Sequence, residues 1–290
     1  MISRRAFLRL FGGAFAAGAG AFAYAFIEPR YRLAATTYRF TPPGFAKLDR
    51  PLRIAALADL HACDPWMPLP RIEEIVRTTN ALSPDLVVLL GDYVSGIHRF
   101  GTRPVAIEDW TTVLAKLEAP LGKFAVLGNH DWWEDPEGVR QGLEHNGIPV
   151  LENDARKLKT ARGTEFWLAG LGDQLAYGNA RTGYRGVHDL PKTMRAISDD
   201  APAILLAHEP DIFPEVPARI SLTLSGHTHG GQVRIPGIGP LLVPSRYGRR
   251  YAYGHIVEKN RHLVVSGGLG CTFLPIRFAM PPEIVLLELG

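Results

Sequence analysis

Five short clusters of potential metal ligands recur along the chain, each at the end of an apolar run. Together they hold three carboxylates, one Asn amide and five imidazoles. The clusters are Asp59-Leu60-His61, Gly91-Asp92, Gly128-Asn129-His130-Asp131, His208 and Gly226-His227-Thr228-His229. Two neighbouring divalent cations of intermediate softness bind such a mixture of oxygen and nitrogen ligands. The pattern therefore indicates a metal centre.

The apolar run before each cluster predicts a strand that positions it. Ligands of open α/β sheets bind where the carboxyl ends of the strands meet, so the five strand ends should converge into one rim. Gly91, Gly128 and Gly226 precede three of the clusters. A residue without Cβ lets the backbone turn sharply or approach an ion closely at these points.

From Leu52 onward, strand-like and helix-like apolar patterns alternate, which predicts parallel strands joined by helices. Helices are expected at Leu69–Leu82, Val105–Leu117, Glu137–Asn146 and Leu190–Ser198. Strands are expected at Leu52–Ala58, Leu86–Leu90, Phe124–Leu127, Ala155–Lys159, Phe166–Leu171, Ala203–Ala207, Ile220–Leu224, Tyr251–Val257, Leu263–Ser266 and Ile284–Leu289. The change of rhythm after residue 150 predicts a second sheet packed on the first, with helices outside.

The N-terminus is similar to a twin-arginine export leader. Arg4, Arg5 and Arg9 precede an uncharged stretch from Leu10 to Ile27. Cleavage at Ala21-Phe22-Ala23 and retention as a membrane anchor both stay open, because the stretch is long enough to span a thin bilayer. We expect a signal peptide or signal anchor over residues 1–27, a Pro- and Gly-rich linker over 28–51, and one domain over 52–290.

Charge and cysteine content exclude other classes of protein. The net charge of +3 is contributed by the three leader arginines, so the rest is neutral. A nucleic-acid binder shows a sustained basic face, which a short arginine cluster at 246–250 does not supply, and no nucleic-acid partner is expected. Cys63 and Cys271 do not make a disulfide framework, and whether they pair stays open. Paired-Cys spacing typical of a zinc-thiolate site does not occur in the sequence.

The five clusters, in this order, resemble the motifs of the calcineurin-like metallophosphoesterase superfamily: Asp-x-His, Gly-Asp, Gly-Asn-His-Asp/Glu, a lone His, and Gly-His-x-His. The residues around them resemble the branch of exported bacterial phosphodiesterases typified by YkuE and YaeI. They include Gly91-Asp92-Tyr93-Val94, Asn129-His130-Asp131-Trp132-Trp133 and Gly226-His227-Thr228-His229-Gly230-Gly231-Gln232. The resemblance extends from Leu52 to the C-terminus. It implies an α/β fold, a four-layer αββα sandwich of two mixed β-sheets flanked by helices.

The resemblance also implies two ion sites that share one carboxylate. The assigned ligands are Asp59, His61 and His229 for the first ion, Asn129, His208 and His227 for the second, and Asp92 as the bridge. Two divalent metal ions, manganese first, with iron, zinc or cobalt left open, would activate a bridging hydroxide for attack on phosphorus. His130 would be the catalytic residue that donates a hydrogen bond or a proton to the phosphoryl group, while Asp131 either orients it or caps the following turn.

Substrate recognition is less specified. Arg246, Arg250 and Arg277 are candidates for binding a substrate phosphate, because a planar guanidinium suits that group. Trp132 and Trp133 line a groove or belong to the core. Phosphoprotein phosphatases place an Asp a few residues after Gly-Asp, where this chain has Tyr93-Val94-Ser95-Gly96, so a protein phosphatase is not expected.

We therefore expect a monomeric, dinuclear metal-dependent phosphoesterase, a phosphodiesterase of the periplasm or cell envelope. It would act on a small-molecule or lipid-linked phosphoester, after export by the twin-arginine machinery, with contact to the membrane through its N-terminal segment. Two alternatives stay open. One is a UDP-2,3-diacylglucosamine pyrophosphatase-type hydrolase, which acts on the cytoplasmic side and needs an uncleaved anchor facing inward. The other is a non-catalytic binding module stabilised by its ions.

Overall fold

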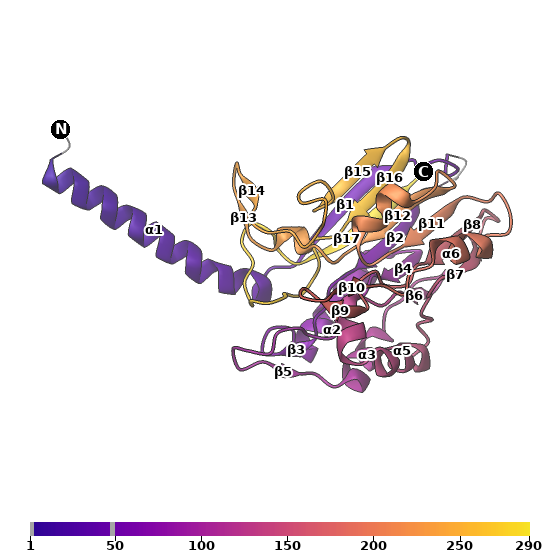
Figure 1. Cartoon of the computed structure of the whole chain (residues 1–290), viewed down its shortest axis with the longest axis horizontal. Helices are drawn as coiled ribbons and strands as arrows, with labels where there is room; N and C mark the ends of the chain where they lie inside the picture. Colours follow the sequence, from indigo (N-terminus) through magenta and orange to yellow (C-terminus); the bar gives the residue numbers. More distant parts are fainter. Residues whose placement is uncertain (1–2, 47–49) are drawn as a thin grey trace.

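Two mixed sheets lie face to face in the computed structural model, which describes residues 3–46 and 50–290 (Figure 1). The first has the strand order β1-β17-β2-β4-β6, and the second has the order β15-β16-β12-β11-β8-β7. The first sheet contains β1 (Ala34–Phe40), β2 (Leu52–Leu57), β4 (Leu86–Leu89), β6 (Lys123–Ala125) and β17 (Glu283–Leu289). The second contains β7 (Asp154–Lys159), β8 (Glu165–Gly170), β11 (Ala203–Leu206), β12 (Ile220–Ser225), β15 (Gly254–Glu258) and β16 (Arg261–Val265).

Most strand pairs are parallel, as the alternation of strands and helices predicts. In the first sheet β17 and β2 pair antiparallel, and in the second the outer pairs β15–β16 and β7–β8 do so. The strands β2, β4 and β6 run parallel, as do β8, β11, β12 and β16. Their carboxyl ends consequently lie along one edge of each sheet.

The central strands β4 and β11 consist of buried apolar residues only, as expected for strands that are covered on both faces. In β2, Ile54 and Ala56 contact the core between the sheets, while Ala55 and Leu57 face the helices. This alternation is the two-residue period of a strand.

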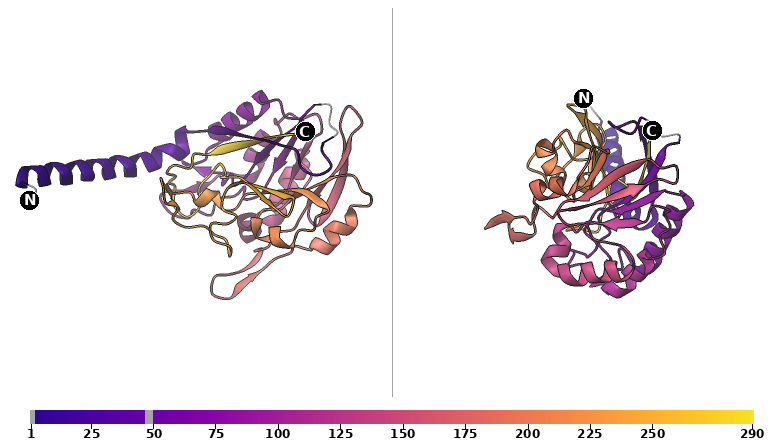
Figure 2. Two further views of the ribbon diagram at one scale, coloured as in Figure 1. Left: turned by 90° about the horizontal axis from the view of Figure 1, so that it is seen from above. Right: turned by 90° about the vertical axis from the view of Figure 1, so that its right-hand side faces the viewer.

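Helices cover the outer faces of both sheets (Figure 2). The first sheet is covered by α2 (Leu69–Ala81), α3 (Ile107–Leu114) and α5 (Pro136–His145), and the second by α6 (Leu190–Ala196) and the 3₁₀ helix η1 (Pro210–Glu215). On α2, Ile72, Ile75 and Val76 have helical spacing and are all buried. The predicted fold of two mixed sheets flanked by helices is confirmed.

Residues 34–40 correct the expectation of a linker over 28–51. They form β1, which pairs in parallel with β17 from Ala34 beside Glu283 to Phe40 beside Leu289. As an edge strand, β1 is only half-buried and carries polar Thr36, Thr37 and Arg39, so its sequence lacks the apolar run of the central strands. The Pro- and Gly-containing residues 41–46 are irregular, as expected.

The sequence also gave no sign of several short elements. They are α4 (Asn129–Glu134), the paired strands β3 (Cys63–Asp64) and β5 (Arg103–Pro104), the hairpin β9 (Tyr177–Asn179) and β10 (Gly183–Arg185), and the hairpin β13 (Arg234–Ile235) and β14 (Gly239–Pro240). The β9–β10 hairpin projects from the body of the domain (Figure 2). Cys63 and Cys271 are buried and free, so they do not pair in this structure.

A long helix, α1 (Arg4–Tyr31), extends away from the domain (Figures 1 and 2). Its segment Leu8–Tyr31 is long and apolar enough to cross a membrane, and little of it is buried against the protein. Its far end contacts the domain, because the buried carboxylate of Glu28 accepts hydrogen bonds from the backbone amides of Ala279 and Met280.

Candidate metal centre

The five ligand clusters meet at one edge of the sandwich. Each begins within three residues of the end of β2, β4, β6, β11 or β12. Five of the seven expected ligands have left-handed backbone conformations, with φ between 49° and 66°. They are Asp59, His61, Asp92, His227 and His229. Such a conformation costs a non-glycine residue on the order of 1–3 kcal/mol, and clusters of this strain occur at functional sites.

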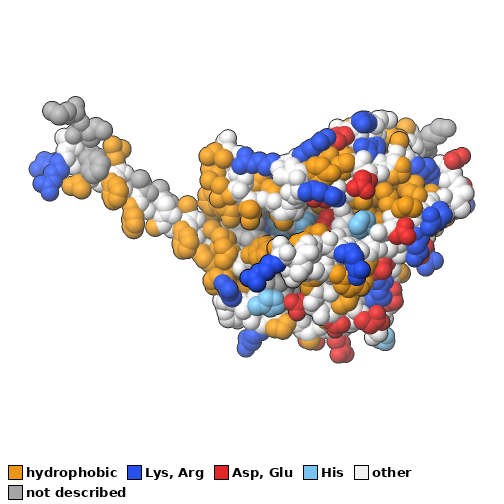
Figure 3. All heavy atoms as spheres, viewed as in Figure 1, with side chains coloured by type: hydrophobic (Ala, Val, Ile, Leu, Met, Phe, Trp, Pro, Cys, Tyr) orange, Lys and Arg blue, Asp and Glu red, His pale blue; other side chains and the backbone are white. Residues whose placement is uncertain are grey.

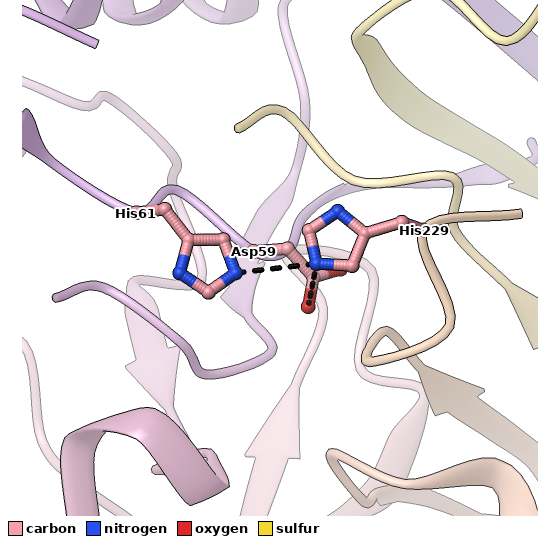
Figure 4. A group of neighbouring side chains, drawn as sticks. All are labelled: Asp59, His61 and His229. Carbon is pink, nitrogen blue, oxygen red and sulfur yellow. Dashed lines mark hydrogen bonds and ion pairs between the residues drawn. The ribbon is translucent and has the colours of Figure 1, made fainter. Parts of the chain in front are cut away.

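Asp59, His61 and His229 form the first ligand group (Figure 4). The Nε2 atoms of the two imidazoles lie 3.2 Å apart, and Nε2 of His229 is 3.8 Å from Oδ1 of Asp59. The second carboxylate oxygen of Asp59 is buried without a hydrogen-bond partner. Polar atoms that are buried together in this way are stabilised by a cation between them.

Asp92, His208 and His227 form the second ligand group. Nε2 of His208 is 3.2 Å from Oδ2 of Asp92, and it has no hydrogen-bond partner. Asn129 belongs to the same group, because its Oδ1 lies 2.9 Å from Nδ1 of His227. The chain therefore brings all four expected ligands of the second ion together.

Asp92 joins the two groups. The Oδ2 atom that approaches His208 also lies 3.7 Å from Nε2 of His61 in the first group. The carboxylate is buried, and its other oxygen accepts a hydrogen bond from the backbone amide of His130 at 2.8 Å. This is the position of the predicted bridge.

Two backbone carbonyls orient candidate imidazole ligands. Nδ1 of His61 is 2.9 Å from the oxygen of Val94, and Nδ1 of His208 is 2.6 Å from that of Leu90. When these nitrogens donate their protons to the carbonyls, the Nε2 lone pairs face the centre. Metal-binding histidines are commonly oriented by such bonds.

Burial sets the charge state of the site. It lowers the pKa of the His61 imidazole to about 3, so that the ring is neutral and can bind a cation. It raises the pKa of the Asp59 carboxyl to about 7. Burial also opposes ionisation of Asp92, but neighbouring His208 and His130 outweigh it and hold that pKa well below its usual value. Burial likewise lowers the pKa of His227 and His229, whereas for His208 the neighbouring Asp92 outweighs burial and raises the pKa well above its usual value. Bound divalent cations would favour the ionised acids and the neutral form of His208.

Asp131 clamps the loop that carries Asp92. Its Oδ1 accepts hydrogen bonds from the amides of Tyr93 and Val94 at 2.8 and 3.2 Å, and its Oδ2 accepts from those of Asp92 and Gly128 at 2.9 Å each. The bond from Gly128 caps the first turn of α4. Of the two roles that the sequence left open for Asp131, the cap is confirmed, and the clamp is a function that the sequence did not reveal.

His130 lies on α4 at the boundary between the ligand groups and an adjoining cavity. Its Nε2 is 3.3 Å from Oγ1 of Thr272, and its ring meets that of His61 edge-on at 4.9 Å. Burial lowers the pKa of His130. Gly96 packs against the ring so closely that a Cβ there would lie 2.0 Å from Cε1 of His130.

A cavity of about 690 Å³ opens beside the centre, and Figure 3 shows the molecular surface hollowed there. The wall includes His130 and four candidate ligands, Asp92, Asn129, His227 and His229. The rest of the wall includes Trp133, Gln174, Leu175, Tyr184, Arg185, Gly186, His188, Glu209, Ser245, Arg246, Thr272 and Phe273. A substrate in this cavity would touch both ligand groups.

The three arginines predicted for substrate binding differ in position. Arg246 lines the cavity, where its Nε lies 3.5 Å from Oδ2 of Asp211. Arg250 lies outside the lining and pairs with Glu258 at 2.8 Å.

Arg277 corrects the expectation of a substrate ligand. Its side chain is fully buried and donates to the backbone carbonyls of Gly267, Gly270 and Met280. It also lies 3.2 Å from Nδ1 of His229, so it positions the ring of that candidate ligand. A buried arginine saturates its donors within the protein, and the sequence does not reveal that burial.

The cavity wall contains residues that sequence reasoning missed. Glu209 directly follows the candidate ligand His208, is buried, and accepts hydrogen bonds from Gln174. Arg185 belongs to the β9–β10 hairpin, whose exposed strands have no apolar pattern that would predict them from the sequence. Trp133 lines the cavity and stacks on Tyr184, whereas Trp132 packs against the core, so each alternative for the tryptophan pair holds for one residue.

An α/β sandwich with two groups of candidate ligands that share a carboxylate at its strand ends is the arrangement expected of a metal-dependent hydrolase. The family model of calcineurin-like phosphoesterases matches residues 52–231. The chain belongs to this family and is a metal-dependent phosphoesterase that uses divalent metals.

The similarity to two bacterial proteins extends over nearly the whole chain. An uncharacterized metallophosphoesterase of Bacillus subtilis, YkuE, is 34% identical and covers 99% of this chain and 98% of its own length. Phosphodiesterase YaeI of Escherichia coli is 32% identical, with both chains covered completely. Among solved structures, a 5'-nucleotidase precursor of Thermus thermophilus has a TM-score of 0.50 at 12% identity, covering 82% of this chain and 54% of that one, and shows the fold alone.

Proposed function

We propose that the chain is a phosphodiesterase of the bacterial cell envelope that holds two ions, manganese in the first instance. The observation that carries the proposal is the position of Asp92, whose one oxygen approaches His61 of the first ligand group and His208 of the second. The diester preference is supported by the similarity to YaeI, which is named a phosphodiesterase.

Each group of side chains would have a separate role in such a reaction. Two bound ions would supply Lewis acidity for the phosphoryl oxygens and lower the pKa of water at the site. The seven ligands would hold that pair, with Asp92 fixing its separation. His130 faces the cavity beside both groups and can donate a hydrogen bond to a phosphoryl or leaving oxygen, while Thr272 positions its Nε2. Arg246 offers a positive charge on the cavity wall for the rest of the substrate.

The N-terminal residues support an envelope location. Arg4 and Arg5 lie at the start of α1, whose apolar segment suits export followed by cleavage or by anchoring. Replacing both arginines by lysine should leave the chain in the cytoplasm of a host with a twin-arginine system. Export of the double variant at the normal level would contradict this route.

Turnover of bis-p-nitrophenyl phosphate by the full chain with Mn²⁺ tests the activity. We expect hydrolysis that chelation abolishes and that falls by about 10²-fold or more in His130→Ala, since general acid–base groups typically contribute that much. His145→Ala, an exposed histidine at the end of α5, is the matched control and should retain full activity. Metal binding without product, and no effect of His130→Ala, would instead identify a non-catalytic module.

A further inference from the structure

A patch of exposed apolar side chains lies on the domain beside the end of α1. We name it the apolar rim, and it consists of Ile235, Ile238, Leu241, Leu242, Phe273 and Leu274. Their exposed fractions run from 37% for Ile235 to 73% for Leu242. Figures 1 and 2 show the β13–β14 hairpin at the α1 end of the molecule, and Figure 3 shows hydrophobic side chains gathered there. Contiguous patches of this kind mark interaction sites.

The two segments of the rim form one surface. The side-chain amide of Gln232 donates to the carbonyls of Thr272 and Leu274 at 3.2 and 3.0 Å. The backbone amide of Thr272 donates in return to Oε1 of Gln232 at 2.9 Å. The segment 272–274 is therefore tied to the residues that lead into the β13–β14 hairpin.

The same surface is tied to α1. The amide of Arg277 donates to the carbonyl of Ala25 at 2.9 Å, and the rings of Tyr24 and Phe278 meet at 6.1 Å. The carbonyl of Phe278 accepts from the amide of Arg234 in β13 at 2.9 Å. Residues 277–280 thus lie between the helix and the hairpin and bind both.

The residues at the end of α1 suit a membrane–water interface. Tyr31 is 70% exposed, and the guanidinium of Arg30 lies 5.7 Å from the Tyr31 ring and 5.6 Å from the Trp66 ring. Aromatic rings with neighbouring arginines are typical where a membrane helix leaves the bilayer. Leucine and isoleucine side chains that are held beside such a helix end are stabilised when they enter the same lipid.

We propose that the apolar rim docks into the lipid bilayer in which α1 is inserted. Thr272 and Phe273 also line the cavity of the metal centre, so docking places the cavity mouth at the lipid headgroups. The substrate class that fits is an amphiphilic phosphoester whose head enters the cavity while its chains stay in the bilayer. This last step rests on the proposed phosphodiesterase activity, whereas the docking itself does not.

Docking is tested by the lipid exposure of single sites in the full chain, reconstituted in vesicles of phosphatidylethanolamine and phosphatidylglycerol. In Leu242→Cys a nitroxide label attaches to position 242 alone, because the native Cys63 and Cys271 are buried. Val257→Cys, on the edge strand β15 and 53% exposed, is the matched control. We expect the label at 242 to be reached by lipid-soluble oxygen and shielded from a water-soluble nickel complex, with the reverse at 257. Equal access of the nickel complex to both sites would overturn the proposal.

Substrate delivery is tested with two phosphodiesters that share a leaving group. Hexadecyl p-nitrophenyl phosphate is embedded in the vesicles, and bis-p-nitrophenyl phosphate is dissolved in water. The double variant Leu241→Asp, Leu242→Asp should lose at least about tenfold in rate on the embedded diester and nothing on the soluble one, while Val257→Asp changes neither. Equal rates for variant and wild type on the embedded diester, or equal losses on both substrates, would overturn delivery from the bilayer. If the wild type hydrolyses neither diester, the phosphodiesterase proposal fails, and the nitroxide result still decides docking.

Discussion

Gly96 gives the steric prediction with the largest expected effect in the site. A Cβ at this position would lie 2.0 Å from Cε1 and 2.2 Å from Nδ1 of His130. Ordinary van der Waals contact begins near 3.4 Å, so the ring or the loop must move by more than 1 Å in Gly96→Ala. A misplacement of about 1 Å in a reacting group can cost 10²-fold in rate, or about 2.7 kcal/mol in activation free energy.

The assay is kcat and KM for bis-p-nitrophenyl phosphate with Mn²⁺ in Gly96→Ala, His130→Ala and the double variant. We expect kcat of Gly96→Ala to fall about 10²-fold, and the same substitution to cost little further in the His130→Ala background, since it acts through that ring. Gly12→Ala, whose Cβ would meet nothing within 4 Å, is the control and should be silent. Full activity of Gly96→Ala, or an undiminished loss in the double variant, would refute the assigned role of Gly96.

Three further experiments probe separate contacts. Asp131→Asn should lower the free energy of unfolding, measured by urea denaturation, by about 2 kcal/mol or more. The reason is that an amide cannot accept hydrogen bonds from all four backbone N–H groups that the carboxylate binds. An unchanged urea midpoint would exclude the clamp. Arg246→Ala should raise KM several-fold while Arg250→Ala leaves it unchanged, and equal effects would remove Arg246 from the substrate contact. Burial raises the pKa of the Cys271 thiol to about 11, so the native protein should resist iodoacetamide at pH 8. The thiol should react once the pH approaches about 11 or once the chain unfolds. Rapid alkylation of the native protein at pH 8 would contradict the burial of Cys271.

The convergence of the candidate ligands could be predicted because motif order and strand ends are both visible in the sequence. A buried parallel strand is a continuous apolar run, and the residue that follows it must lie at the sheet edge. This pattern predicts that Asp59, Asp92 and His208 share one rim, and the structure brings their groups together.

Other features escaped prediction because they depend on packing. β1 is an edge strand whose partner β17 lies at the other end of the chain, so no local pattern marks it. Arg277 has the residue type of a phosphate ligand, but its burial behind His229 is fixed by long-range contacts. Gly96 matters only because the ring of His130 occupies the space where its side chain would be.

The ion content of the purified chain tests the central claim most directly. Elemental analysis after equilibrium dialysis against Mn²⁺ should find about two ions per chain in the wild type and a clear loss of bound metal in Asp92→Ala, because that carboxylate contributes to both ligand groups. The control His145→Ala should match the wild type. Fewer than one ion per wild-type chain, or an unchanged ion count in Asp92→Ala, would contradict a dinuclear centre bridged by Asp92.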